Sequence, residues 1–247
     1  MNRIENYSEV KDRIVKWIND YVDANNIKSL VVGVSGGIDS AVTSTLCAHT
    51  GLPTYVIGMP LLQKSNQEDL SDLHMAWLAQ NFHFNVTVRK FDLTSVFEMF
   101  KALMGEEFNS NHSLANSRSR LRMVTLYQVA TTTGGIVVGT GNKVEDYGVG
   151  FFTKYGDGGV DIAPIADLYK TEVWELGKFL GIDQRIIEAE PTDGLWDDAR
   201  TDEDQLGVPY ATLEEAMEHG TGLGVEVLKK FNTQNQHKMQ PIPTFKL

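Results

Sequence analysis

The sequence predicts an α/β fold with a parallel sheet that helices cover on both faces, and three observations support this prediction. Short apolar runs alternate along the chain with segments of helical periodicity. The runs are almost continuously apolar, which is typical of parallel strands buried on both faces. A glycine-rich turn joins the first clear apolar run to a helical segment. In such sheets, ligands bind where the strands end at their carboxyl side.

The elements follow in a regular order. Strands are expected at 30–34, 54–59, 84–89 and 136–140. Helices are expected at 7–25, 41–46, 66–80, 92–104 and 113–133, with Asp92 as an N-cap, and after the sheet at 170–180, 212–219 and 225–236. A mobile glycine-rich loop is expected at 151–159 and an extended tail at 237–247. We therefore expect one domain, with an α/β core at 1–165 and a helical C-terminal segment at 166–247 packed on it.

Composition limits the classes of function. The chain has 247 residues, a net charge of −11 and a single cysteine, Cys47. A nucleic-acid-binding protein usually carries a basic stripe, which this sequence lacks, so we expect no nucleic-acid partner. No apolar run is long enough for a membrane span, and the first residues do not resemble a signal peptide. The histidines have no metal-ligand spacing, so a zinc site is not expected. These features favour a cytoplasmic protein.

The most informative motif is the glycine-rich turn Ser-Gly-Gly-Ile-Asp-Ser after the strand Leu-Val-Val-Gly-Val. Glycines let backbone N–H groups turn toward an anion, and the N-terminus of a helix favours negative charge. The turn lacks the Lys-Ser/Thr pair of a P-loop and the spacing of the dinucleotide-binding fingerprint. It resembles the pyrophosphate loop of the ATP pyrophosphatase superfamily, whose members cleave ATP between its α and β phosphates. The residues of this predicted phosphate site are Gly33, Val34, Ser35, Gly36, Gly37, Ile38, Asp39 and Ser40.

A second motif, Gly-Thr-Gly-Asn-Lys-Val-Glu, follows the fourth expected strand and ends at Glu145. Asp39 follows the first strand, and strand ends of the same sense meet at one edge of a parallel sheet. Mg²⁺ in nucleotide sites prefers one or two carboxylates together with phosphate oxygens. We therefore predict that Asp39 and Glu145 hold a magnesium ion. Two unrelated loop carboxylates are the alternative interpretation.

A third motif, Gly-Phe-Phe-Thr-Lys-Tyr-Gly-Asp-Gly-Gly-Val-Asp over 150–161, makes the resemblance specific. Together with the two motifs above it is similar to NAD synthetases. Pro-Thr-Asp-Gly-Leu at 191–195, Asp202-Glu203, Leu206-Gly207 and His237-Lys238 fit the same family. The resemblance extends from about residue 8 to about residue 245. It implies a Rossmann-like fold of the adenine nucleotide α hydrolase type.

The resemblance also implies a reaction. The family converts deamido-NAD (nicotinic acid adenine dinucleotide) to NAD with ATP, Mg²⁺ and ammonia, through an adenylated carboxylate. Residues carried over as catalytic are Asp39, Glu145 and Lys170, the two carboxylates as metal ligands. Thr140, Lys170 and Thr192 match ATP-binding positions beside the phosphate loop. Positions that contact deamido-NAD are Arg120, Lys154, Asp161, His237 and Lys238.

Two departures from the family pattern stand out. The segment between Glu145 and Gly150 is one residue longer than the usual spacing, which affects the local loop geometry. Ser119 stands beside Arg120 where the family often has alanine.

Two other functions share the phosphate loop. One is another ligase of the superfamily, such as an enzyme that amidates a nucleotide base or thiolates tRNA. The other is a non-catalytic ATP sensor, which would have no use for Asp39, Glu145 and Lys170. Release of pyrophosphate only in the presence of deamido-NAD would separate all three.

The sequence leads to two further expectations. The helix at 113–133 is apolar around its whole circumference, which predicts burial against a second subunit in a homodimer. The alternative is that C-terminal segments of the same chain cover it. We also expect free ammonia rather than glutamine to be the nitrogen donor, because no segment is left for an amidase domain. Cys47 lies in a helix without a base on its face, so it is not expected to act as a nucleophile.

Overall fold

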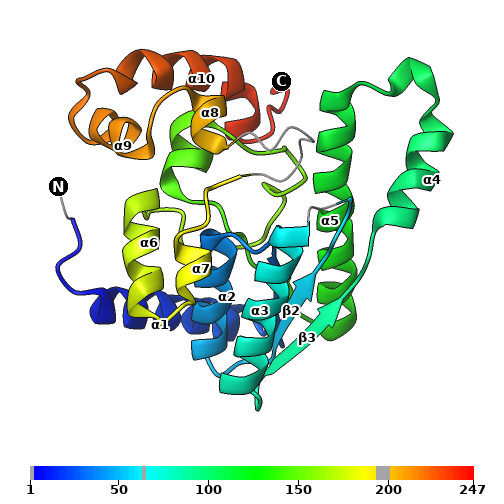
Figure 1. Ribbon diagram of the computed structural model, residues 1–247, viewed down its shortest axis with the longest axis vertical. Coiled ribbons are helices and arrows are strands. Elements are labelled where there is room, and N and C mark those ends of the chain that lie inside the picture. Colours follow the sequence, from blue (N-terminus) through cyan, green and yellow to red (C-terminus); the bar gives the residue numbers. More distant parts are fainter. Residues whose placement is uncertain (1–2, 63–64, 193–200) are drawn as a thin grey trace.

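The computed structural model describes residues 3–62, 65–192 and 201–247 (Figure 1). Its sheet has four parallel strands in the order β3-β2-β1-β4, which confirms the predicted fold class. The strands are β1 (Leu30–Val34), β2 (Thr54–Gly58), β3 (Val86–Lys90) and β4 (Ile136–Val137). Because β1 is central and entirely apolar, both of its faces are buried.

Helices cover the two faces of the sheet. Alternate residues of β1 point to opposite layers: Val32 packs with α1, α2 and α3, and Val31 packs with α4 and α5. Figure 1 shows α5 on the side of the sheet opposite α2 and α3. These five helices are α1 (Tyr7–Asn25), α2 (Ile38–His49), α3 (Ser65–Asn81), α4 (Thr94–Met104) and α5 (Asn111–Thr133).

Three strands differ from their expected ranges, and β2 differs least because it ends one residue early, at Gly58. β3 begins two residues late because Phe84 is 78% exposed and the Asn85 side chain donates to the carbonyls of Ala48 and Leu52, which anchors the preceding turn. β4 is shorter than expected, although extended pairing continues through a bridge between Val138 and Ile162. The chain therefore leaves the sheet edge gradually, which brings the segment after Gly159 beside β4.

Helix starts also shift by one to three residues, the most at α2, which begins at Ile38 rather than at residue 41. α4 begins at Thr94 rather than Asp92, but the predicted cap operates, because Asp92 Oδ1 accepts from Thr94 N at 2.9 Å. α5 starts at Asn111, where Ser110 is the N-cap and accepts from Ser113 N. A short 3₁₀ turn, η1 (Glu106–Phe108), occupies part of the polar stretch before it.

Helices α8, α9 and α10 gather around a π-helix, η2 (Lys143–Val149), that the sequence analysis missed. They lie together at the end of the molecule away from α1, whereas α6 and α7 pack against α1 and α2 (Figure 1). α10 continues to Met239, so the expectation of an extended tail is wrong for its first three residues. Basic residues are favourable in a last helical turn, as His237 and Lys238 are here. The helices are α6 (Lys170–Phe179), α7 (Gln184–Ile187), α8 (Asp202–Leu206), α9 (Tyr210–His219) and α10 (Gly224–Met239).

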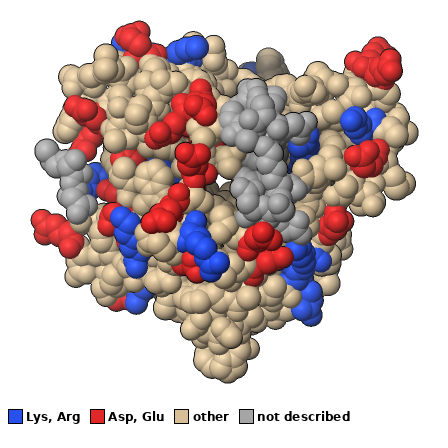
Figure 2. Space-filling view, viewed as in Figure 1, with Lys and Arg blue, Asp and Glu red and all other residues tan. Residues whose placement is uncertain are grey.

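The surface is of mixed charge. On the described part of the face in Figure 2, lysine and arginine side chains lie among aspartates and glutamates and do not form a continuous stripe. No helix among the described residues has the length and hydropathy needed to cross a bilayer.

Candidate active site

The phosphate loop joins β1 to α2 as the sequence predicted. Gly36 has φ of +94°, a backbone conformation that favours glycine. Gly37 is the N-cap of α2, and its N–H donates to Ser35 Oγ at 3.3 Å. Ser40 Oγ donates to the Gly37 carbonyl and accepts from Ser35 N. These contacts hold the turn open at a helix N-terminus, the geometry that binds an anion.

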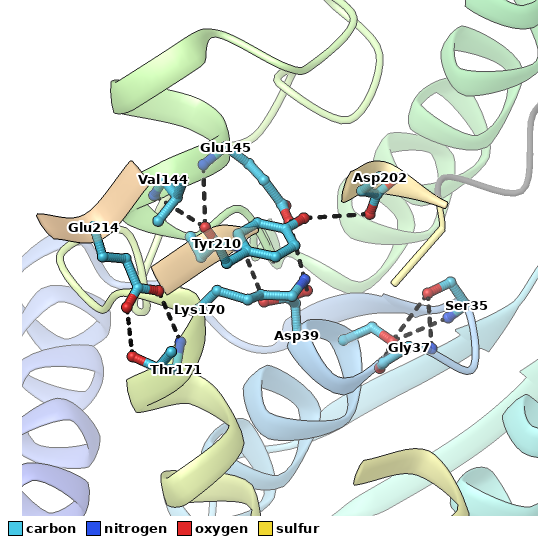
Figure 3. A network of polar contacts seen from close by, with 12 residues as sticks. Ser35, Gly37, Asp39, Val144, Glu145, Lys170, Thr171, Asp202, Tyr210 and Glu214 are labelled. Carbon is cyan, nitrogen blue, oxygen red and sulfur yellow. Dashed lines mark hydrogen bonds and ion pairs between the residues drawn. The ribbon is translucent and has the colours of Figure 1, made fainter. Parts of the chain in front are cut away.

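The three predicted catalytic side chains meet at this end of the sheet (Figure 3). Lys170 Nζ lies 2.5 Å from Asp39 Oδ2 and 2.9 Å from Glu145 Oε1. Asp39 comes from the first turn of α2, Glu145 from η2 and Lys170 from the first residue of α6. Three segments far apart in the chain thus converge on one buried ammonium, and the two carboxylates are neighbours as predicted.

Burial and mutual charge set the pKa values of this cluster. Burial would lower the pKa of Lys170, but Asp39 and Glu145 raise it above its ordinary value, so the side chain stays an ammonium. Burial raises the pKa of Asp39, and the Lys170 ammonium only partly offsets this. For Glu145, burial is outweighed by Lys170 and by a hydroxyl donor, and its pKa is lowered. Glu145 is therefore the carboxylate more firmly held in its ionised form.

The π-helix covers the segment after Glu145 in which the family resemblance implies one extra residue. Its wider i→i+5 winding takes up one residue that an α-helical turn would not, and π-turns of this kind are frequent at functional sites. Asn142 caps η2 by accepting from the N–H groups of Val144 and Glu145, while its Nδ2 donates to Asp39 Oδ1 at 3.1 Å. One fully buried amide therefore holds both η2 and Asp39. Asparagine before an apolar segment is an N-cap signal in sequence, so this role could have been inferred.

Tyr210 belongs to the cluster although no sequence motif pointed to it. Its hydroxyl donates to Glu145 Oε1 at 2.6 Å and lies 3.4 Å from Asp202 Oδ2 (Figure 3). Burial, and then the negative charges of Glu145 and Asp202, raise the pKa of Tyr210, which keeps the phenol protonated. No short motif links positions 145 and 210, since only the folding of α9 onto η2 brings them together.

The donor set fits a magnesium ion bound together with a nucleotide. Among the described residues, no three His, Cys, Asp or Glu side chains are grouped to hold a metal ion by themselves. Asp39 and Glu145 provide two carboxylates next to an anion-binding turn, so phosphate oxygens and water would complete the coordination. This is the arrangement expected for Mg²⁺ that arrives with ATP.

The predicted substrate-binding cations lie around the glycine-rich loop after η2. Arg120 Nε on α5 donates to the Lys154 carbonyl at 3.3 Å, and Lys154 Nζ donates to the His237 carbonyl at 3.4 Å. Lys238 Nζ donates to the Phe152 carbonyl at 2.6 Å. Four of the five residues thus come together from α5, the loop and α10.

The loop itself is fastened to α5 through Ser119. Ser119 Oγ donates to Asp157 Oδ1 at 2.6 Å and accepts from Asp157 N at 2.8 Å. Thr153 N donates to the same carboxylate oxygen. An alanine at position 119 could make neither side-chain contact, so the serine orders the loop beside Arg120.

Asp161 is placed differently from the other four. Its Oδ2 accepts from Val137 N at 2.7 Å and its Oδ1 accepts from Tyr127 OH at 3.0 Å. Both carboxylate oxygens therefore tie the loop to β4 and α5. Burial and the Asp161 charge raise the pKa of Tyr127 to about 12, so its phenol remains a donor.

Two ATP-binding candidates are less defined. Thr140 is half-buried just after β4, and Thr192 is exposed at the end of a described segment. The rest of the Pro-Thr-Asp-Gly-Leu motif, residues 193–195, lies outside the described residues.

Asp146 interacts electrostatically with both groups of predicted site residues. Burial, followed by the charges of Glu145, Asp157 and Asp39, raises the pKa of Asp146 well above its usual range, while Lys238 opposes the shift. The charge of Asp146 therefore interacts both with the carboxylate cluster (Asp39, Glu145 and Lys170) and with Lys238 of the cation-rich loop (151–159 together with Arg120, His237 and Lys238).

Known proteins similar to this chain match it over nearly its whole length. The sequence profile described as NAD synthase matches residues 10–243. The chain is 36% identical to the NH(3)-dependent NAD(+) synthetase of Alkaliphilus metalliredigens, an alignment that covers 94% of this chain and 96% of that protein. It is 37% identical to the protein of the same name from Carboxydothermus hydrogenoformans, with 94% and 95% covered.

Solved structures give the same fold. An NMN synthetase from Francisella tularensis superimposes with a TM-score of 0.91 at 30% identity, covering 99% of this chain and all of that one. An NH3-dependent NAD synthetase from Campylobacter jejuni gives a TM-score of 0.76 at 26% identity, with 98% and 100% covered.

Proposed function

We propose that this chain, which belongs to the NAD synthase family, converts deamido-NAD to NAD with ATP, Mg²⁺ and ammonia. The family assignment makes it an ammonia-dependent amide ligase of the NAD or NMN synthetase type, and the substrate is the part that we propose. The observation that carries the proposal is the convergence of Asp39, Glu145 and Lys170 beside an anion-binding turn.

The reaction proceeds in two steps. An oxygen of the nicotinate carboxylate attacks the α-phosphorus of ATP, the bond between the α-phosphorus and its bridging oxygen breaks, and pyrophosphate leaves. Ammonia then attacks the carbonyl carbon of the acyl adenylate, the acyl C–O bond breaks and AMP leaves. A bound Mg²⁺ would offset the negative charge that develops on the leaving pyrophosphate.

The residues of the chain bind and orient the reactants. The turn 35–37 and the N-terminus of α2 would hold phosphate oxygens through backbone N–H groups. Lys170 stays an ammonium, and its charge can stabilise the leaving group. Arg120, Lys154 and Lys238 already donate to carbonyl oxygens, and the pyrophosphate and carboxylate of the substrate offer stronger, charged acceptors.

A second candidate substrate is the deamido form of the mononucleotide. It is favoured by the high TM-score with the NMN synthetase from Francisella tularensis. The two reactions share the adenylation chemistry and differ only in what the substrate carries beyond its first phosphate. The curated relatives at 36–37% identity, which are named NAD synthetases, favour the dinucleotide.

The decisive assay compares acceptors in one experiment. Purified protein is incubated with ATP, Mg²⁺ and ammonium together with deamido-NAD, with nicotinate mononucleotide or with no acceptor. We expect stoichiometric amide, AMP and pyrophosphate with the dinucleotide and a much lower kcat/KM with the mononucleotide. The reverse preference would replace the proposed substrate, and pyrophosphate release without any acceptor would contradict a ligase.

We also propose that the enzyme is a homodimer. α5 keeps apolar surface that its own chain covers only in part, because Leu121, Met123 and Leu126 are half-buried and Val124 is 58% exposed. A second copy is the simplest cover for such a face, and it would bring Arg120 of α5 close to the interface. Light scattering on active protein should give twice 27.5 kDa, and an active species of 27.5 kDa would contradict the proposal.

A further inference from the structure

Tyr210 reaches the carboxylate cluster from the C-terminal helices. It is the first residue of α9 and is 1% exposed. Its backbone N–H donates to Glu203 Oε1 at 2.9 Å, and its ring packs edge-on against Trp174, with 6.0 Å between ring centroids. The phenol is therefore held at both ends, and its hydroxyl is a fixed donor beside Glu145.

We propose that Tyr210 is a positioning residue that orients the Glu145 carboxylate for a metal ion bound with ATP. This inference rests on the proposed function and adds to it a residue from outside the recognised motifs. The Tyr210 hydroxyl and Lys170 Nζ both donate to Glu145 Oε1, at 2.6 and 2.9 Å. Because both of these donors bond to Oε1, the proposal assigns Oε2 to the metal.

The hydroxyl contributes something that Lys170 cannot. Lys170 Nζ is shared between Asp39 and Glu145, and it can be drawn to a phosphate when ATP binds. The Tyr210 contact is then what keeps Oε1 in place. Its length of 2.6 Å is that of a strong hydrogen bond between a hydroxyl and a carboxylate. Groups that orient a metal ligand in this way commonly affect metal affinity by about 10- to 100-fold.

Asp39 also accepts one hydrogen bond from Lys170 and one from a second donor, which here is an amide. Its Oδ2 accepts from Lys170, and its Oδ1 accepts from the buried amide of Asn142. Each carboxylate thus has one contact to the shared ammonium and one to a neutral, buried donor. The neutral donor of Glu145 comes from α9, which makes the packing of the C-terminal helices a condition for the metal site.

The test uses the full-length protein and a direct measure of metal binding. Mn²⁺ is titrated into the protein in the presence of a non-hydrolysable ATP analogue, with free Mn²⁺ followed by electron paramagnetic resonance. Tyr210→Phe retains the ring and removes only the hydroxyl. We expect Mn²⁺ affinity to fall about tenfold and the Mg²⁺ concentration for half-maximal activity to rise by a similar factor. Affinity for the analogue without metal should not change.

Thr171→Val is the matched control. Thr171 Oγ1 donates to Glu214 Oε2 at 2.6 Å, so it joins α6 to α9 as Tyr210 joins α9 to η2, but without touching Glu145 (Figure 3). We expect Thr171→Val to leave Mn²⁺ affinity unchanged. An equal loss in both variants would mean that Tyr210 only packs the helix, and it would overturn the proposal. Unchanged Mn²⁺ affinity in Tyr210→Phe would overturn it as well.

A double-mutant comparison completes the test. In a Glu145→Gln background, Tyr210→Phe should cause no additional loss of Mn²⁺ affinity, since the group it orients is already gone. A further tenfold loss would contradict a role through Glu145. Melting curves set the assay temperature below every transition, so a less stable variant is still measured in its folded form. The Mn²⁺ titration does not depend on the acceptor, so failure of the proposed amidation would leave this result interpretable.

Discussion

The carboxylate cluster and the cation-rich loop are assembled by different kinds of contact. In the cluster, charged side chains bond to one another: Lys170 Nζ to Asp39 and to Glu145. Around the loop, Lys154 and Lys238 donate to backbone carbonyls, so their charges have no ionic partner in those contacts. In the cluster, the Lys170 ammonium already has two carboxylate partners that hold it in place. Around the loop, the positive charges of Lys154 and Lys238 are available to an anionic substrate. We therefore expect changes in the first region to affect kcat and changes in the second to affect KM.

The largest effect is expected from the two carboxylates. Asp39→Asn and Glu145→Gln should each lower kcat by about 10²-fold or more, because each removes a charge that steadies the transition state. The fold should survive, since Lys170 keeps one ionic partner in either variant. Steady-state rates at limiting and saturating Mg²⁺, with circular dichroism as a check on folding, measure this.

Asp20→Asn is the matched control, because Asp20 pairs with Lys16 on the exposed face of α1, in a contact outside the site. It should behave as wild type. Near-normal turnover of either cluster variant at limiting Mg²⁺ would contradict a two-carboxylate metal site.

The next effect concerns the stability of the fold around α2, the helix that carries Asp39. His74 on α3 is 2% exposed, and its Nε2 pairs with Ser44 Oγ on α2 at 2.9 Å. Burial lowers the pKa of His74 to about 4. The unfolded chain therefore takes up this proton first as pH falls, at its ordinary pKa of about 6.5.

The contribution of neutral His74 to stability is full above about pH 6.5 and is lost progressively toward pH 4. The shift corresponds to about 3 kcal/mol of unfolding free energy. Urea unfolding at pH 7 and pH 4 should show this loss in wild type and not in His74→Gln. His83→Gln, at an exposed position, should keep the wild-type pH dependence. An identical acid response in all three proteins would exclude His74 as its source.

Substitutions around the cation-rich loop should weaken binding of the substrate. Lys154→Ala or Arg120→Ala should raise KM for deamido-NAD by about tenfold or more, the usual value of a hydrogen bond to a charged group. KM for ATP and kcat should change by no more than about twofold, because neither residue touches the carboxylate cluster. Initial rates with each substrate varied in turn test this. A fall in kcat with unchanged KM would remove the distinction between the two regions.

The sequence identified both regions but not how each is held together. The strand-glycine-helix pattern and the spacing to Glu145 located the phosphate turn and the two carboxylates, because these depend on local structure at strand ends. Asn142 follows a readable N-cap rule, although its second bond, to Asp39, depends on tertiary packing. The only hint of the π-helix in the sequence was one extra residue after Glu145. Its winding could not be predicted, because α9 and α10 pack around it in the folded chain. Tyr210 could not be inferred, because its partner lies 65 residues away on another element.

Substitution of Asp161 should have a smaller effect, on stability rather than on substrate affinity. Its two oxygens accept from Val137 N and Tyr127 OH, so we expect Asp161→Asn to lower the unfolding free energy by about 1 kcal/mol. KM for deamido-NAD should stay within about twofold of wild type if this fastening is its whole role. Urea unfolding and initial rates together decide the matter. A large rise in KM with unchanged stability would show that Asp161 contacts the substrate, as the family resemblance implies.

The smallest effect is expected at Cys47, and it separates ammonia from glutamine as the nitrogen donor. Cys47 is fully buried in α2, and burial raises the pKa of its thiol to about 12. A thiol that is neither ionised nor accessible cannot attack glutamine, since the thiolate is the nucleophile. Cys47→Ser should therefore leave the rate with ammonium nearly unchanged, and that rate should rise with pH as ammonium loses its proton. Parallel assays with ammonium and with glutamine test both statements. Amide formation from glutamine alone, abolished in Cys47→Ser, would show that the nitrogen enters through a covalent step at this cysteine.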